Sequence, residues 1–300
     1  MRMRLLGQSG LEVSVVGLGC NNFGGRIDEE RSRAVIEAAL DAGITFLDTA
    51  DVYGNRGGSE EIIGRALAGR RDRVVLATKF GHDMGDGEEA RGSRAYLRSA
   101  LDASLRRLQT DWIDLYQYHR PDRVTPLEET ITALDELVRE GRIRAYGTSN
   151  HSAQQVEEAA ALAKESYVSE QSEYSWLRQD VERDLLPACE RLGLGFIPYF
   201  PLASGLLTGK VGRERPPPPD SRLHGRPIDE ADLERVERLS ALAEEFGVSL
   251  LQLAIGGLAA QPAVLSVIAG ATKPEQVRAN AEAGAWAPSA EQLDRIRAAS

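Results

Sequence analysis

The amino-acid sequence predicts a (β/α)8 barrel, the TIM-barrel fold, formed by one domain over residues 1–300. Short apolar runs alternate with segments whose apolar residues recur at helical spacing, and eight such strand–helix units follow one another. The length of 300 residues suits eight units. No linker divides the chain, and no G-x-G-x-x-G glycine fingerprint, typical of an open doubly wound sheet, follows an early strand.

An N-terminal β-hairpin precedes the first unit, because Gly7-Gln8-Ser9-Gly10 is a turn signal between residues 3–6 and 11–14. Gly43 follows one predicted helix at the C-cap position, and Pro126 opens another. Pro216 to Pro219 must be extended or loop. The predicted strands are 15–18, 45–47, 74–78, 113–118, 143–148, 168–171, 194–199 and 264–268. The predicted helices are 28–42, 59–68, 94–108, 126–139, 152–163, 180–192, 230–246 and 250–259, followed by two extra C-terminal helices over 274–283 and 290–298.

The composition favours a cytoplasmic protein. The net charge of −10 argues against a general binder of nucleic acid or of anionic membranes. Cys20 and Cys189 lie far apart in the sequence, which fits a reducing compartment. The basic start, residues 1–4, is not followed by an apolar signal region, so no signal peptide is expected. The most hydrophobic window, residues 250–271, is interrupted by polar residues and proline, so no membrane span is expected.

Polar side chains follow three successive predicted strands, where a barrel usually houses its chemistry. Asp48 and Tyr53 follow the second strand, Lys79 follows the third and His119 follows the fourth. We expect these four side chains to meet at one rim. Each alone has an ordinary explanation as a cap, a packed aromatic, a solvated ammonium or a turn imidazole. Their joint placement favours a catalytic set.

These residue types suit proton transfer to a carbonyl oxygen. A free phenol has a pKa of about 10, so the ammonium of Lys79 is expected to lower the pKa of Tyr53, while Asp48 keeps the lysine charged. Tyr53 would then donate a proton to a developing alkoxide. His119 would hydrogen-bond the same oxygen and orient it. His82, His151 and His224 show no metal-ligand spacing, so no metal site is predicted.

The chain resembles the aldo-keto reductase family over nearly all its length. The resemblance rests on residues 43–54 (GITFLDTADVYG), Thr78-Lys79, residues 114–119 (DLYQYH) and residues 147–150 (GTSN). It implies a barrel with neither a separate Rossmann domain nor a metal. It also implies NADPH-dependent reduction of a carbonyl compound by a catalytic tetrad, carried here by Asp48, Tyr53, Lys79 and His119.

The resemblance further implies a nicotinamide cofactor site. Ser149, Asn150 and Gln171 match the residues that bind the carboxamide, and Tyr199 matches the aromatic that stacks on the nicotinamide ring. Many relatives place arginine where Gln276 stands and glutamate where Ala279 stands; Lys273 is the substitute cation that favours NADP, and NAD is not excluded. The full set of residues expected at the cofactor is Asp48, Ser149, Asn150, Gln171, Tyr199, Phe200, Pro201, Leu202, Ser204, Gly205, Lys210, Arg222, Gly270, Thr272, Lys273, Gln276 and Asn280.

Two other functions stay open at this point. One is a subunit that senses the cofactor and turns over slowly. Family members associated with potassium channels resemble such a subunit. The other is a Schiff-base aldolase with Lys79 as the nucleophile. The expected partner is a small carbonyl compound rather than a nucleic acid or a membrane, while its identity, the direction of the reaction and the oligomeric state are open. Phe23, Phe80, Tyr174 and Trp176 are candidate pocket aromatics, with packing in the core as the alternative.

Overall fold

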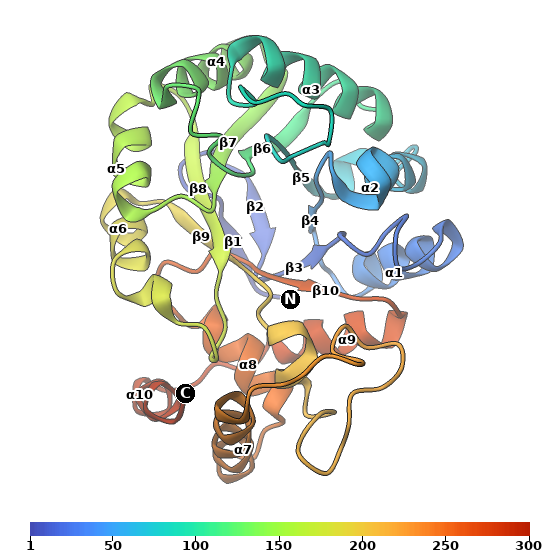
Figure 1. The fold of residues 1–300 in the computed structure, drawn as a ribbon, viewed down its shortest axis with the longest axis vertical. Helices are drawn as coiled ribbons and strands as arrows, with labels where there is room; N and C mark the ends of the chain where they lie inside the picture. The colour runs from blue at the N-terminus through green and yellow to red at the C-terminus, as the bar shows by residue number, and fades with distance from the viewer.

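The structure, a computed structural model, describes residues 1–300 and contains the predicted barrel. Eight parallel strands lie in the order β10-β3-β4-β5-β6-β7-β8-β9, and helices surround them (Figure 1). The strands are β3 (Val16–Gly19), β4 (Phe46–Asp48), β5 (Val75–Phe80), β6 (Ile113–Tyr118), β7 (Ile143–Ser149), β8 (Tyr167–Glu173), β9 (Gly195–Tyr199) and β10 (Val267–Gly270).

The two end strands of this order are joined near Phe196, which nearly closes the sheet into a barrel. Phe196 on β9 forms a parallel bridge with Val264. Its amide donates to the carbonyl of Ala263, and its carbonyl accepts from the amide of Leu265, both at 2.7 Å. The eighth strand was predicted over 264–268, but β10 begins at Val267. The segment 263–270 contacts two neighbouring strands. Residues 263–265 hydrogen-bond to β9, and residues 267–270 pair with β3.

The helices lie close to the predicted ranges, except that the helix predicted over 59–68 begins at Tyr53 and that residues 180–192 are divided ahead of a proline. Residues 180–192 form a short 3-10 turn, η2 (Asp180–Glu182), and then helix α6 (Leu185–Leu192). Proline fits only the first turn of a helix, and a start at Leu185 places Pro187 there. The other helices are α1 (Glu29–Asp41), α2 (Tyr53–Ala66), α3 (Arg94–Leu108), α4 (Leu127–Arg139), α5 (Ala153–Leu162), α7 (Glu230–Glu245), α8 (Leu250–Ala259), α9 (Pro274–Ala283) and α10 (Ala290–Ala299), with 3-10 turns η1 (Arg71–Arg73) and η3 (Ala203–Thr208).

The predicted hairpin, β1 (Met3–Leu5) and β2 (Glu12–Ser14), supplies apolar side chains to the inside of the barrel. Leu6 and Val13 are fully buried and belong to a cluster with one apolar residue from every strand of the barrel except β3. Side chains alternate between the two faces of a strand, so these positions mark the inward face. The members of the cluster are Leu6, Val13, Phe46, Ala77, Leu115, Ala145, Val168, Ile197, Leu265 and Ile268.

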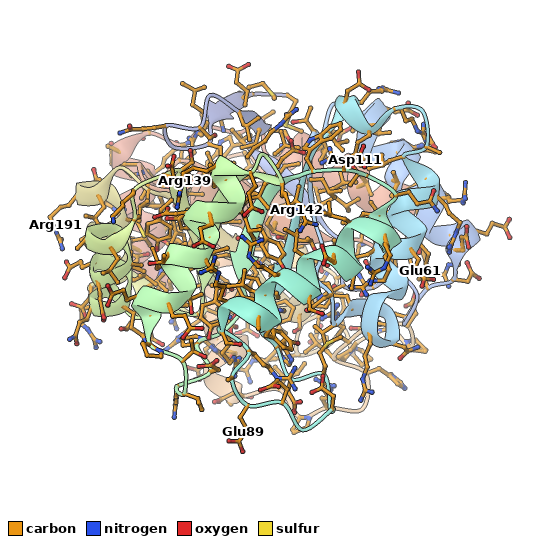
Figure 2. All side chains as sticks on the ribbon, turned by 90° about the horizontal axis from the view of Figure 1, so that it is seen from above. Glu61, Glu89, Asp111, Arg139, Arg142 and Arg191 are labelled. Atoms are coloured by element: carbon orange, nitrogen blue, oxygen red, sulfur yellow. The ribbon has the colours of Figure 1, made fainter.

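The two ends of the barrel are easily located. Glu89 follows β5 and Asp111 precedes β6, and Figure 2 places these residues at opposite ends of the molecule. The end near Glu89 therefore carries the C-terminal ends of the strands, where barrels hold their functional residues. Taken one at a time, none of the helices has the length and apolar composition needed to cross a membrane. Helices α7 and α8 reach that composition only as a pair, and they meet at 89°.

Candidate active site

A polar layer lies directly above the apolar cluster inside the barrel. Phe46, Ala77 and Leu115 point inward, so the residues two positions later on the same strands point inward as well. Those residues are Asp48, Lys79 and Gln117. Gln171 joins them from β8. The strand alternation thus gathers one carboxylate, one ammonium and two amides in a buried layer at the C-terminal end of the barrel.

Asp48 and Lys79 form a buried ion pair. The Nζ of Lys79 donates to Oδ2 of Asp48 at 2.6 Å and to the carbonyl of Thr49 at 2.8 Å. Oδ1 of Asp48 accepts from Nε2 of Gln117 at 3.1 Å and from Nε2 of Gln171 at 2.9 Å. Burial by itself would lower the pKa of Lys79, but the charge and hydrogen bond of Asp48, together with Tyr53 and Cys20, outweigh it and the pKa is raised. Lys79 is therefore a permanent cation held in one place.

Tyr53 lies over this pair. The Nζ of Lys79 is 5.3 Å from the centroid of the phenol ring. The chain can make this turn because Gly54 has a φ of 66°, and a Cβ at that position would lie 2.5 Å from the carbonyl oxygen of Phe23 and the amide of Ser59. Regular helix starts only after Gly57, where φ is 115°, in agreement with the helix predicted over 59–68.

The expectation that Lys79 makes Tyr53 titrate below a free phenol is wrong in this structure. Burial raises the pKa of Tyr53, and the opposing effect of the Lys79 charge is smaller. Desolvation disfavours a buried phenolate unless the compensating charges exceed its cost. Tyr53 is consequently a protonated phenol at neutral pH, which is the form that a proton donor needs.

His119 faces Tyr53 across the same site. The two rings meet edge to face with centroids 5.8 Å apart. Burial lowers the pKa of His119 well below its ordinary value, and the charge of Lys79 lowers it further, so the imidazole is neutral at pH 7. Its buried Nδ1 has no hydrogen-bond partner. The Nδ2 of Asn150 donates to the carbonyl of His119 at 2.9 Å, which ties β6 to the loop after β7.

A second buried network holds the turn that carries Tyr53. The hydroxyls of Thr49 and Ser59 are 2.8 Å apart. Thr78 donates to Glu60 at 2.5 Å, and Nε of Arg107 donates to the same carboxylate at 2.6 Å. These contacts join the end of β4, the end of β5 and helices α2 and α3. They fix the start of α2 relative to the strand that bears Lys79.

Asp51 makes the stability of the folded protein depend on pH. It is 2% exposed, its Oδ1 has no partner, and burial together with Glu60 raises its pKa to about 7. In the unfolded chain an aspartate has a pKa of about 4. The folded state therefore binds the extra proton between these values, and its stability falls as the pH rises from about 4 to about 7.

Asp51→Asn removes this titration. We expect the free energy of unfolding of the variant, relative to wild type, to rise by about 2–3 kcal/mol between pH 5 and pH 8, because about two pKa units separate pH 5 from the folded pKa and each is worth about 1.4 kcal/mol. Urea unfolding at the two pH values measures it. The exposed Asp72→Asn is the control and should leave the pH dependence unchanged. Equal pH dependence in Asp51→Asn and wild type would contradict the assignment.

One cavity of about 720 Å³ opens above the polar layer. Of the predicted tetrad, Asp48, Tyr53 and His119 line it, while Lys79 lies beneath and is fully buried. All residues expected at the cofactor also line it: Asp48, Ser149, Asn150, Gln171, Tyr199, Phe200, Pro201, Leu202, Ser204, Gly205, Lys210, Arg222, Gly270, Thr272, Lys273, Gln276 and Asn280. The structure therefore brings both predicted sets to one cavity.

The far part of the cavity is suited to a phosphate-bearing ligand. Lys210, Arg222 and Lys273 line it, and Lys273 is the residue directly before helix α9. The start of a helix and nearby cations both favour anions. Arg222 donates to Asn21 and Asn22 at 2.8 Å, and Lys273 pairs with Asp220 at 3.1 Å. These residues fit the diphosphate and adenosine end of a nicotinamide dinucleotide.

Gln276, which stands where relatives place arginine, has a structural contact of its own. Its Oε1 accepts from the amide of Thr272 at 2.7 Å and from the Thr272 hydroxyl at 3.2 Å. It thereby closes the turn before α9, while the neighbouring Lys273 supplies the positive charge.

Sequence reasoning missed several residues of the site. Gln117, which lies in the buried polar layer and donates to Asp48, could have been found from strand alternation, since it stands two positions before His119 on the predicted strand. Nothing in the local pattern singles out the others, which come from the loops after β3, β5 and β6: Asn21, Asn22, Arg26, His82 and Arg120. No group of three or more His, Cys, Asp or Glu side chains is placed to hold a metal ion.

The four candidate pocket aromatics are core residues. Phe23, Phe80, Tyr174 and Trp176 are fully buried and none lines the cavity. The ring of Phe80 stacks on those of Tyr116 and Tyr118, with centroids 4.7 and 5.1 Å apart. The alternative interpretation, packing, is the correct one.

The comparisons with known proteins agree with this geometry. The family model described as "Aldo/keto reductase family" matches residues 15–300. The chain belongs to the aldo/keto reductase family. Among related proteins, a probable voltage-gated potassium channel subunit beta from Oryza sativa subsp. japonica is 40% identical over 99% of this chain and 96% of its own. The aldo-keto reductase YhdN from Bacillus subtilis is 38% identical over 99% of this chain and 92% of its own.

A solved aldo/keto reductase has the same fold. The holo form of AKR11C1 from Bacillus halodurans superposes with a TM-score of 0.85 and 36% sequence identity, covering 100% of this chain and 96% of that one. This aldo/keto reductase is accordingly an oxidoreductase of carbonyl compounds, built on a (β/α)8 barrel.

Proposed function

We propose that this aldo/keto reductase reduces a small aldehyde or ketone to an alcohol, with NADPH as the reductant and Tyr53 as the general acid. The observation that carries the proposal is the buried Lys79–Asp48 pair, 2.6 Å apart, beneath a protonated Tyr53 that shares the cavity with a neutral His119. A phenol, a fixed cation and an uncharged imidazole at one point can together stabilise and protonate a developing alkoxide.

The chain's own residues divide this work. Tyr53 gives its phenolic proton to the carbonyl oxygen, and the ammonium of Lys79 stabilises the phenolate that forms. Asp48 holds Lys79 in place, and its own position is fixed by the amides of Gln117 and Gln171. His119, neutral because its pKa is lowered, directs an imidazole N–H toward the same oxygen and orients it. A reduced nicotinamide, when bound in this cavity, would supply the hydride for the carbonyl carbon.

The cofactor assignment follows from the cations of the cavity. Lys210 and Arg222 would hold the diphosphate, and Lys273 would hold the 2′-phosphate that distinguishes NADPH from NADH. Ser149, Asn150 and Gln171 would bind the carboxamide beside Tyr199. The protein is proposed to work in the cytoplasm on a small-molecule substrate.

A screen of neutral aldehydes and ketones with NADPH and with NADH tests the function. We expect carbonyl-dependent loss of absorbance at the reduced nicotinamide band, with a lower KM for NADPH than for NADH because Lys273 supplies a positive charge. Tight NADPH binding measured by fluorescence, together with no carbonyl-dependent turnover for any substrate, would overturn the reductase assignment.

That second outcome would favour a sensing subunit that binds the cofactor and turns over slowly. The rice relative named as a probable potassium channel subunit beta, 40% identical to this chain, supports this candidate. The Schiff-base aldolase has no such support. An amine nucleophile must be uncharged and must reach the substrate, whereas Lys79 has a raised pKa and does not line the cavity.

A further inference from the structure

Arg120 is a positively charged residue of the cavity that belongs neither to the proposed tetrad nor to the proposed cofactor residues. It follows His119 directly at the C-terminal end of β6 and lines the same cavity. It forms no ion pair and its side chain makes no hydrogen bond within the protein. Its guanidinium is therefore free to bind a ligand.

The carboxylates of the cavity wall are already neutralised. Asp48 pairs with Lys79 and Asp220 pairs with Lys273, and no other acidic residue lines the cavity. Arg26, Arg120, Lys210 and Arg222 leave the cavity with an excess of positive charge in a protein whose net charge is −10. An anion is attracted to such a site more strongly than to the surrounding surface.

These cations lie at two ends of the cavity, the proposed cofactor end and the catalytic end. Arg222 and Lys273 lie toward the loops and helix at the proposed cofactor end, where the diphosphate would neutralise Arg222 and the 2′-phosphate would bind Lys273. Arg120 lies at the catalytic end, beside His119 in the chain. Its positive charge contributes to lowering the pKa of His119 and partly offsets the raised pKa of Tyr199, so it acts at the site of the carbonyl group.

We infer that the substrate is a carbonyl compound with an anionic group, a carboxylate or a phosphate, which Arg120 binds while Tyr53 and His119 hold the carbonyl oxygen. This inference rests on the proposed reductase function. The planar guanidinium presents paired N–H donors that match the oxygens of carboxylate and phosphate, so Arg120 would select such substrates by charge and by shape.

The loop after β6 contains a matched control. Arg123 is three residues further along, exposed and also without an ion pair, but it does not line the cavity. A general effect of removing one positive charge from this surface would appear equally in Arg120→Gln and Arg123→Gln. A binding role for Arg120 would appear only in the first.

The test uses two pairs of aldehydes that differ in charge: 4-carboxybenzaldehyde with its methyl ester, and glyceraldehyde 3-phosphate with glyceraldehyde. The ratio of kcat/KM for the charged member to that for the neutral member is measured for each pair. We expect this ratio to be well above one in wild type and to fall about 10- to 100-fold in Arg120→Gln, because a hydrogen-bonded charge pair is lost. Arg123→Gln should keep the wild-type ratio, and Arg120→Lys should recover part of it.

The aldehyde pair with the larger kcat/KM ratio identifies the preferred anionic group, carboxylate or phosphate. A wild-type ratio near one in both pairs, or an unchanged ratio in Arg120→Gln, would overturn the inference. If no aldehyde is reduced, the proposed reductase function is wrong. Whether Arg120 binds an anionic ligand is then tested by a binding measurement alone. Titration calorimetry of wild type and Arg120→Gln with 4-(hydroxymethyl)benzoate should then show weaker binding in the variant, and equal or absent binding in both would refute it.

Discussion

Replacing Tyr53 by phenylalanine should lower kcat for carbonyl reduction about 10²- to 10⁴-fold, the range that a positioned general acid contributes. The substitution removes only the hydroxyl, so the ring keeps its place above the Lys79–Asp48 pair and its edge-to-face contact with His119. Steady-state assays at saturating cofactor measure the effect. Cofactor affinity, measured by fluorescence titration, should stay near wild type because the cofactor end of the cavity is untouched.

Tyr96→Phe is the matched control. Tyr96 is also partly buried and its hydroxyl accepts a hydrogen bond from Arg91 at 2.8 Å, but it does not line the cavity. The same loss of hydroxyl there should leave kcat within about twofold of wild type, since it touches no reacting group. If Tyr53→Phe kept full activity, or if Tyr96→Phe lost as much, Tyr53 would not be the proton donor.

Replacing Lys79 by methionine should cost both activity and stability. Lys79 is fully buried, and its removal leaves the carboxylate of Asp48 without a countercharge in the interior. Breaking a buried ion pair in this way destabilises a protein by about 3–5 kcal/mol. Urea unfolding should show that loss, and kcat should fall because no cation then stabilises the phenolate of Tyr53.

The double variant Asp48→Asn with Lys79→Met separates the two effects. Neutralising both partners removes the unpaired charge, so most of the lost unfolding free energy should return. Activity should not return, because the cation is still missing. A double variant that is as unstable as Lys79→Met would show that the lysine stabilises the fold by packing rather than by pairing with Asp48.

Most elements of the barrel follow from local patterns. The hairpin, the strand over 113–118 and the helices over 94–108 and 250–259 have the predicted bounds or nearly so. Their signals are alternation, helical spacing and capping residues, all of which act within a few positions. The prediction is wrong where a distant partner decides, as in the eighth strand, whose first residues bond to β9 and whose last residues pair with β3.

The gathering of the proposed catalytic residues at one site was predictable for a related reason. Parallel strands end at one rim of a barrel, so Asp48, Lys79 and His119 could be placed together from their positions at strand ends alone. The aromatic candidates failed because a ring that packs in the core and a ring that lines a pocket have the same local sequence. Whether Phe80 and Trp176 lie in the core or line a pocket depends on which helices and strands cover them.

The sequence by itself determined the alternation of strands and helices, and with it the rim on which Asp48, Tyr53, Lys79 and His119 meet. Only the tertiary structure decided the protonation of that set. The direction in which the pKa of Tyr53 shifts depends on how much burial opposes the charge of Lys79, and that burial comes from elements far apart in the chain. The same holds for Arg120, whose free guanidinium is known only once every carboxylate around the cavity has been located.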